Sequence, residues 1–181
     1  MYDKQALQAL VRQKALKFGK FTLASGREAS YYLDCRQVTL DSAGAPLIAA
    51  GMLDLMADDM PELVGGMAIG ADPITAAIVT LAGSREIPLR GIMVRKEPKA
   101  HGTGQTVEGP FVPGERVVIV EDTVTTGGSS LLAIERCEAA GLKVTRVLAV
   151  VDREEGGREA FADRGYELTS LLRVSELLAS P

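Results

Sequence analysis

Between residues 64 and 151 the chain alternates mainly apolar segments with amphipathic ones, and this rhythm constrains its fold more than any other feature. Four segments have the length and composition of buried strands: 64–70, 89–95, 116–121 and 144–151. Two others, 72–83 and 129–141, have helical spacing, and the first opens with Asp72 as a cap and Pro73 at the first helical position. Long apolar strands are typical of parallel sheets covered on both faces. We therefore predict an α/β fold with a central, mainly parallel sheet flanked by helices.

The N-terminal part precedes this alternation and predicts a helix, a pair of strands and a second helix. Residues 3–18 carry apolar side chains at helical spacing. Residues 21–36 contain a strand at each end of a turn. The second helix is expected to begin at Asp41 or Ser42 and to end near Asp59.

Composition excludes several classes of protein. The 181 residues include 20 Lys and Arg against 24 Asp and Glu, a net charge of −4, which is a poor match for a nucleic-acid-binding protein. The two cysteines, Cys35 and Cys137, suit packing positions in a reducing cytoplasm, and the single histidine, His101, leaves no His-rich metal site. No apolar run reaches the roughly 18 residues of a membrane span, and no signal peptide is apparent. We expect a cytoplasmic protein that binds neither membranes nor nucleic acid.

The most informative segment is 117–133, where an apolar strand ends in two acids and a small-residue turn opens a helix. Glu121 and Asp122 stand at the carboxyl end of the strand, where open α/β sheets bind ligands. The turn consists of Thr123, Val124, Thr125, Thr126, Gly127, Gly128 and Ser129. A helix N-terminus with glycines and hydroxyls is suited to a phosphate group.

The two acids cannot also be phosphate ligands, because they would repel the phosphate. They fit as acceptors for sugar hydroxyls or as charges that face a developing cation, so the segment predicts a sugar phosphate ligand. A helix capped by Thr or Ser after an ordinary strand is the alternative. Each residue taken singly fits that alternative, whereas the ordered set is far less common by chance.

The stretch 96–114 has no regular pattern and is expected to be a functional or disordered loop. Arg95, Lys96 and Lys99 place three positive charges against one glutamate, with His101 adjacent. Such a cluster suits a polyphosphate. From charge alone a solvated basic loop is an equally good interpretation, and a lone histidine is more often a surface residue than a catalytic one.

Four blocks of the chain, in order, resemble the type I phosphoribosyltransferases, which bind phosphoribosyl pyrophosphate (PRPP). They are FTLASGREASYYLDCR at 21–36, MVRKEPKAHGTG at 93–104, the segment 117–133, and VVDREEGG at 150–157. The signature 117–133 is specific for the superfamily, and the second and fourth blocks resemble the orotate phosphoribosyltransferases within it. The resemblance covers nearly the whole chain.

The resemblance implies a single phosphoribosyltransferase domain over 1–181. An N-terminal helix and a small hood would occupy about 1–40, and the α/β core about 60–155. A flexible lid would span 96–110 and close over pyrophosphate. A homodimer is implied too, in which lid residues 95–101 reach the neighbouring site. Mg²⁺ would be bound mainly through PRPP oxygens and water, with no dedicated metal ligands.

The implied activity is transfer of ribosyl 5-phosphate from PRPP to orotate, with Lys99, His101, Glu121 and Asp122 as catalytic residues. The residues implied to bind PRPP are Arg95, Lys96, Lys99, His101, Glu121, Asp122, Thr123, Val124, Thr125, Thr126, Gly127, Gly128 and Ser129. Those implied to bind orotate are Thr125 and Arg153, with Ser25, Gly26, Tyr31 and Tyr32 covering the base. Without the resemblance, Arg153 would be interpreted as a surface arginine and the tyrosines as core.

The chain departs from the family pattern at two places. Ala24 stands where some members carry a lysine, and the turn 70–73, which matches the pyrophosphate loop, lacks the lysine found there in some members. Both changes reduce positive charge at the implied site.

Two other functions share this fold. A purine phosphoribosyltransferase would lack the RKxxKxHG loop and a carboxylate-binding arginine. A PRPP-sensing regulator of transcription should carry a DNA-binding extension or a basic face, and neither is present in this sequence. P-loop, dinucleotide and serine-hydrolase motifs are incomplete.

Overall fold

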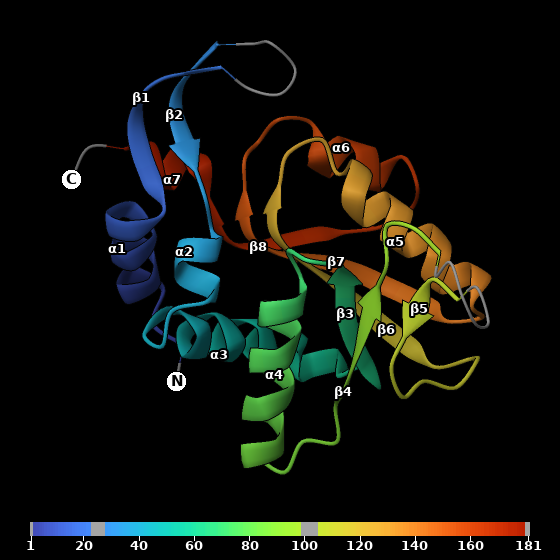
Figure 1. The fold of residues 1–181 in the computed structure, drawn as a ribbon. Coiled ribbons are helices and arrows are strands. Elements are labelled where there is room, and N and C mark those ends of the chain that lie inside the picture. The colour runs from blue at the N-terminus through green and yellow to red at the C-terminus, as the bar shows by residue number, and fades with distance from the viewer. Residues whose placement is uncertain (1, 23–27, 99–104, 180–181) are drawn as a thin grey trace.

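The computed structural model describes residues 2–22, 28–98 and 105–179, and a six-stranded sheet lies at its centre (Figure 1). The strand order is β5-β4-β3-β6-β7-β8, with bounds Val107–Glu108 (β5), Arg90–Val94 (β4), Leu63–Met67 (β3), Arg116–Val124 (β6), Lys143–Asp152 (β7) and Leu168–Arg173 (β8). Every neighbouring pair is parallel except β4 with β5. The predicted mainly parallel sheet is therefore confirmed, and the carboxyl ends of its parallel strands share one edge.

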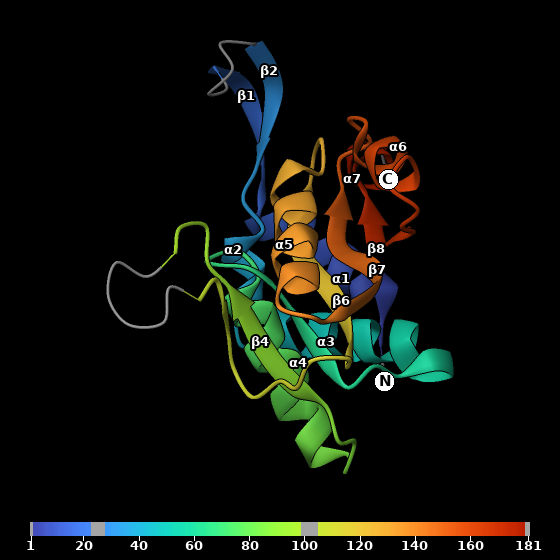
Figure 2. The same ribbon diagram turned by 90° about the vertical axis from the view of Figure 1, so that its right-hand side faces the viewer.

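Helices cover both faces of the sheet (Figures 1 and 2). On one face lie α1 (Lys4–Lys14), α3 (Gly44–Met56) and α4 (Asp72–Ser84), and on the other lie α5 (Gly128–Ala139) and α6 (Gly157–Ala162). This is the flanked arrangement that the sequence predicts. Among the described residues, no helix combines the length and the apolar character needed to cross a membrane.

The strands supply alternate side chains to two apolar layers. In β6, Val118 and Val120 belong to the layer with α3 and α4, whereas Val117 and Ile119 belong to the layer with α5. All four side chains are fully buried. Coverage of both faces explains why the strand is an unbroken apolar run instead of an alternating one.

The N-terminal segment forms a two-stranded antiparallel sheet, β1 (Leu16–Thr22) with β2 (Glu28–Leu33), which rises beyond the carboxyl edge of the central sheet (Figure 2). We call this sheet the hood. The expectation of a helix over 3–18 is wrong at its end, because α1 stops at Lys14. Phe18 lies in β1, where it pairs with Tyr31 and is 71% exposed. Cross-strand pairing with β2 overrides the helical spacing of these few residues.

Three further differences from the expected elements concern short segments. The helix expected from Asp41 or Ser42 to about Asp59 begins later, at Gly44, and consists of α3 followed by a 3-10 turn (Ala57–Asp59). A short helix that was not expected, α2 (Arg36–Thr39), precedes it. Asp41 lies in the turn between α2 and α3, where its carboxylate accepts the backbone N–H of Ala43 at 2.9 Å. The stretch 96–114 contains β5, and α6, β8 and α7 (Val174–Leu178) follow the last predicted strand. Strands of two residues and helices of five or six carry too little periodicity to be recognised.

Candidate active site

The loop 123–129 lies at the carboxyl end of β6, where the strand passes into α5. Gly127 is the N-cap of α5 and adopts φ 82°, and no side chain caps the first turn of the helix. The alternative of a helix capped by Thr or Ser therefore does not hold. The loop lines a cavity of about 210 Å³ together with Glu121 and Ser130. The unpaired N–H groups of a helix start, with their positive dipole end, are available to an anion there.

The acidic pair lies directly before this loop and is largely buried. Glu121 is 7% exposed and accepts a hydrogen bond from Ser130 Oγ at 3.0 Å, and Asp122 Oδ1 accepts the N–H of Thr123 at 2.7 Å. Burial, with the charge of Asp122 as a smaller cause, raises the pKa of Glu121 to about 7. Burial also raises the pKa of Asp122. Near neutral pH the pair therefore carries fewer than two full negative charges.

The turn between β3 and α4 lies next to the acids. A Cβ placed on Gly70 would be 3.2 Å from Glu121 Oε1 and 3.3 Å from Asp122 Oδ1. Both carboxylates thus approach the same backbone position, although they come from neighbouring residues of one strand. Asp72, which opens α4, has a buried Oδ1 with no hydrogen-bond partner among the described residues, and burial raises its pKa. The turn predicted as a pyrophosphate loop is therefore adjacent to the predicted sugar-binding acids.

Arg153 follows β7 and reaches the hood. Its backbone N–H donates to the carbonyl of Val124 at 2.9 Å, and its guanidinium carbon is 5.2 Å from the ring centroid of Tyr31. Nη2 lies 3.4 Å from the Tyr31 hydroxyl and 2.7 Å from Glu155 Oε1. The side chain is 13% exposed, so the interpretation as a surface arginine does not hold. Tyr32, the next residue of β2, packs beside Phe21 instead.

A second layer of residues supports the loop, and the sequence analysis did not identify it. A Cβ on Gly157 would lie 2.4 Å from Val124 Cγ1 and 2.7 Å from the carbonyl oxygen of Thr125. The ring of Phe161, on α6, lies against Gly127. The two glycines that end the VVDREEGG block were the available signal, since a glycine is required where two backbones approach closely.

The buried carboxylate of Asp152 holds the turn that follows β7. Asp152 is 1% exposed, and it pairs with Arg158 Nη2 at 3.1 Å while accepting the N–H of Glu154 at 2.8 Å. Pairing and hydrogen bonding compensate the burial of this charge. The turn that presents Arg153 is therefore fixed at both of its ends.

Only part of the predicted basic cluster lies within the described residues. Arg95 pairs with Glu108 at 3.2 Å, and its backbone carbonyl accepts a hydrogen bond from Arg136. Lys96 is exposed. No hydrogen bond or ion pair among the described residues joins either side chain to the loop 123–129. Lys99 and His101 lie outside the described residues, as do Ala24, Ser25 and Gly26.

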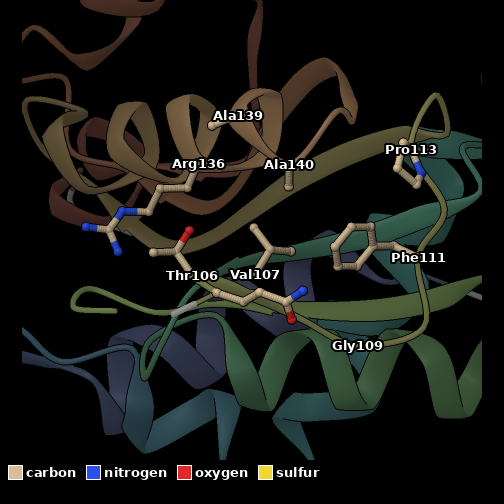
Figure 3. Close-up of a pocket in the computed structure, with 9 residues that line it drawn as sticks. Thr106, Val107, Gly109, Phe111, Pro113, Arg136, Ala139 and Ala140 are labelled. Atoms are coloured by element: carbon tan, nitrogen blue, oxygen red, sulfur yellow. The ribbon is translucent and has the colours of Figure 1, made fainter. Parts of the chain in front are cut away.

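A larger cavity lies elsewhere in the described part of the chain. About 620 Å³ lies between the C-terminal half of α5 and the segment that contains β5, lined by Arg136, Ala140, Val107 and Phe111 among others (Figure 3). None of the predicted site residues lines it. Cavity size alone would therefore have pointed away from the acids and the phosphate-type loop.

Known proteins resemble the chain over nearly its full length, although no protein-family model matches it. It is 56% identical to the orotate phosphoribosyltransferase of Rhodopirellula baltica over 99% of this chain and 96% of that one. The structure matches the orotate phosphoribosyltransferase of Mycobacterium tuberculosis H37Rv, solved with Fe(III) dicitrate, with a TM-score of 0.87. The identity is 41%, over 98% of this chain and all of the other. The complex of the M. tuberculosis enzyme with PRPP matches with a TM-score of 0.82 and 37% identity, over 97% and 99% of the two chains.

The buried Glu121 makes stability depend on pH. Between its ordinary pKa of 4.5 and about 7, the folded protein keeps a proton that the unfolded chain has released, so stability falls as pH rises through this window. Glu121→Gln removes that penalty. We expect the melting temperature of the variant to exceed that of the wild type by more at pH 8 than at pH 5. The exposed control Glu159→Gln should show the same difference at both pH values. A Glu121→Gln difference that is independent of pH would contradict the raised pKa.

The close approach at Gly157 predicts a steric cost. In Gly157→Ala the new methyl group meets Val124 and the carbonyl of Thr125, and we expect a loss of about 1–3 kcal/mol of unfolding free energy in urea titrations. The control is Gly83→Ala in α4, where a Cβ meets nothing within 4 Å and a gain of about 0.5–1 kcal/mol is expected. Equal stability of Gly157→Ala and the wild type would show that the loop does not rest on this glycine.

Proposed function

The chain belongs to the orotate phosphoribosyltransferase family, and we propose that the site at the carboxyl edge of its sheet performs the reaction of that family. In this reaction the ribosyl 5-phosphate group of PRPP is transferred to N1 of orotate, which yields orotidine 5′-monophosphate and pyrophosphate. It is a pentosyl transfer of de novo pyrimidine biosynthesis. The observation that supports the placement most directly is the uncapped start of α5 beside the acidic pair, in which Glu121 is buried and Asp122 half-buried.

The donor's 5-phosphate occupies the loop 123–129 in this proposal. The unpaired N–H groups at the start of α5 and the hydroxyls of Thr123, Thr125, Thr126 and Ser129 donate hydrogen bonds to its oxygens. The N–H groups come from a fixed helix end, so they do not need to reorganise when the anion binds.

Glu121 and Asp122 hold the ribose and stabilise the charge that forms on it. Their carboxylates accept hydrogen bonds from the ring hydroxyls. As the bond between the sugar carbon and the pyrophosphate oxygen breaks, positive charge develops on the ring, and the adjacent carboxylates stabilise it. Burial raises the pKa of both groups and so favours their protonated forms. A positive charge that develops nearby acts in the opposite direction and favours the ionised forms.

Pyrophosphate leaves toward the basic cluster and the turn 70–73. Arg95, Lys96, Lys99 and His101 contact it in the proposal, as the family resemblance implies, and closure of the segment 96–110 excludes water from the reactive carbon. Among the described residues no group of three or more His, Cys, Asp or Glu side chains could hold a metal ion. As the family resemblance implies, Mg²⁺ would be bound mainly through PRPP oxygens and water, and it would neutralise charge on the pyrophosphate.

Arg153 and Thr125 bind the acceptor. The guanidinium is placed by Tyr31 and by the turn after β7, and it carries the fixed pair of donors that suits a carboxylate such as that of orotate. Orotate is readily made anionic at N1, so no strong general base is required. The buried thiols of Cys35 and Cys137 are in keeping with a cytoplasmic location.

Substrate choice tests this function. With PRPP and Mg²⁺ we expect the protein to consume orotate and to leave adenine and hypoxanthine unchanged. The ultraviolet absorbance of orotate measures its consumption. Uracil, which lacks the carboxylate, should react at least about 100-fold more slowly in kcat/KM, because Arg153 would be left unpaired. Consumption of a purine would favour the purine phosphoribosyltransferase alternative. Binding of PRPP without any transfer would favour a regulatory protein.

We also propose a homodimer in which the lid of one subunit completes the site of the other. The family resemblance implies this arrangement. Large exposed apolar side chains, such as Leu40 and Ile69 with exposures of 71% and 79%, are available for contact between subunits. Such a dimer would bring the segment 95–101 to the partner's site.

Mixing two inactive variants tests the shared site. Lys99→Ala and Arg153→Ala should each lose most turnover. If the lid acts on the neighbouring site, each mixed dimer regains one intact site, and co-refolded equal amounts should recover about a quarter of wild-type activity. Recovery near zero, with dimers verified by light scattering, would show that each lid serves its own subunit.

A further inference from the structure

Arg153 already has a carboxylate partner, and that partner is Glu155. The distance from Arg153 Nη2 to Glu155 Oε1 is 2.7 Å, and the two side chains are 13% and 25% exposed. Such a pair is partly shielded from water and is held more firmly than an exposed ion pair. The function proposed above gives Arg153 the acceptor's carboxylate, but it gives no role to Glu155.

The backbone around Glu155 is arranged to place this residue. Glu154 adopts φ 57°, which is uncommon for a residue other than glycine, and Gly156 adopts φ 93°. The conformation of Glu154 is held by two hydrogen bonds: its N–H donates to Asp152 Oδ1 at 2.8 Å, and its Oε2 accepts the N–H of Ser175 at 2.9 Å. Glu155 is therefore flanked by two residues with positive φ. Backbone conformations of this kind persist where the surrounding structure holds them, and here they fix the position of Glu155.

Other parts of the Arg153 guanidinium are also enclosed by protein. One side lies over the ring of Tyr31, at 5.2 Å from the centroid. Nε is buried and has no hydrogen-bond partner among the described residues. The ring of Tyr31 and the carboxylate of Glu155 therefore define the orientation of the guanidinium before any ligand binds.

We propose that Glu155 is a positioning residue, which holds Arg153 Nη2 so that the guanidinium is oriented for the acceptor's carboxylate before the acceptor binds. The inference rests on the proposed function, since it requires that Arg153 bind that carboxylate. Without Glu155 the side chain of Arg153 has to be ordered by the acceptor itself, at the expense of affinity.

The opposite role is that of a competing anion. Glu155 would then occupy Arg153 in the free protein and weaken the binding of any second carboxylate. The two roles predict opposite signs for the effect of removing the side chain, because loss of a competitor strengthens acceptor binding and loss of an anchor weakens it.

Steady-state kinetics with orotate and PRPP separates the two. For Glu155→Ala we expect the KM for orotate to rise about tenfold, the effect of losing one charge-assisted hydrogen bond, with kcat and the KM for PRPP within about twofold of wild type. Glu155→Gln keeps an acceptor oxygen and should restore the KM for orotate to within about threefold. Glu155→Asp keeps the charge but shortens the reach, so its KM should rise as for alanine. The matched control Glu159→Ala removes a nearby exposed carboxylate and should leave all constants unchanged.

A fall in the KM for orotate in both Glu155→Ala and Glu155→Gln would overturn the proposal in favour of competition. An unchanged KM in Glu155→Ala and Glu155→Asp would overturn it too. Arg153→Ala and the wild type report separately on the proposed function. A wild type that does not use orotate would refute the function itself, whereas an Arg153→Ala variant with full activity on orotate would refute the role of Arg153 on which this inference rests. If Glu155→Ala does not fold, Glu155→Asp and Glu155→Gln still give opposite expected results.

Discussion

The parallel pairing of β6 with β7 is the constraint on which the site depends. In this register Val124 lies opposite Asp152, and the N–H of Arg153 donates to the carbonyl of Val124 at 2.9 Å. The phosphate-type loop and the turn that carries Arg153 therefore leave the sheet at the same level. Backbone hydrogen bonds between two buried strands therefore fix the distance between the loop proposed to bind PRPP and the turn proposed to bind orotate. Side-chain flexibility has little influence on this distance.

The carboxyl edge of the sheet combines a positive helix end with two carboxyl groups whose negative charge is disfavoured by burial. The positive end of the α5 dipole and its unpaired N–H groups lie beside the buried carboxylate of Glu121 and the half-buried carboxylate of Asp122, and the pKa values of both are raised. In the proposed function a sugar phosphate matches both halves, because its phosphate would meet the helix end and its hydroxyls would meet the acids. A ligand with only one of these groups would leave the other half of the site unpaired.

The sequence predicted the central sheet, its main helices and the loop after β6, because each of these has a long apolar run or an ordered motif. It did not predict where α1 ends, since Phe18 continues the helical spacing and only pairing with Tyr31 places it in a strand. It also missed Gly157 and Phe161, whose contacts with the loop depend on how α6 packs. Arg153 was recognised through family resemblance alone, and its burial comes from the hood, a contact between residues 122 positions apart.

The acceptor side of the site consequently depends on two sheets. Tyr31 belongs to the hood, whose described strands do not pair with the central sheet, whereas Arg153 and Glu155 belong to the turn after β7. The ring of Tyr31 covers one side of the guanidinium and Glu155 holds its Nη2. A displacement of the hood would remove the first contact but leave the second. An anchor within the turn therefore orients Arg153 independently of the contact with the hood.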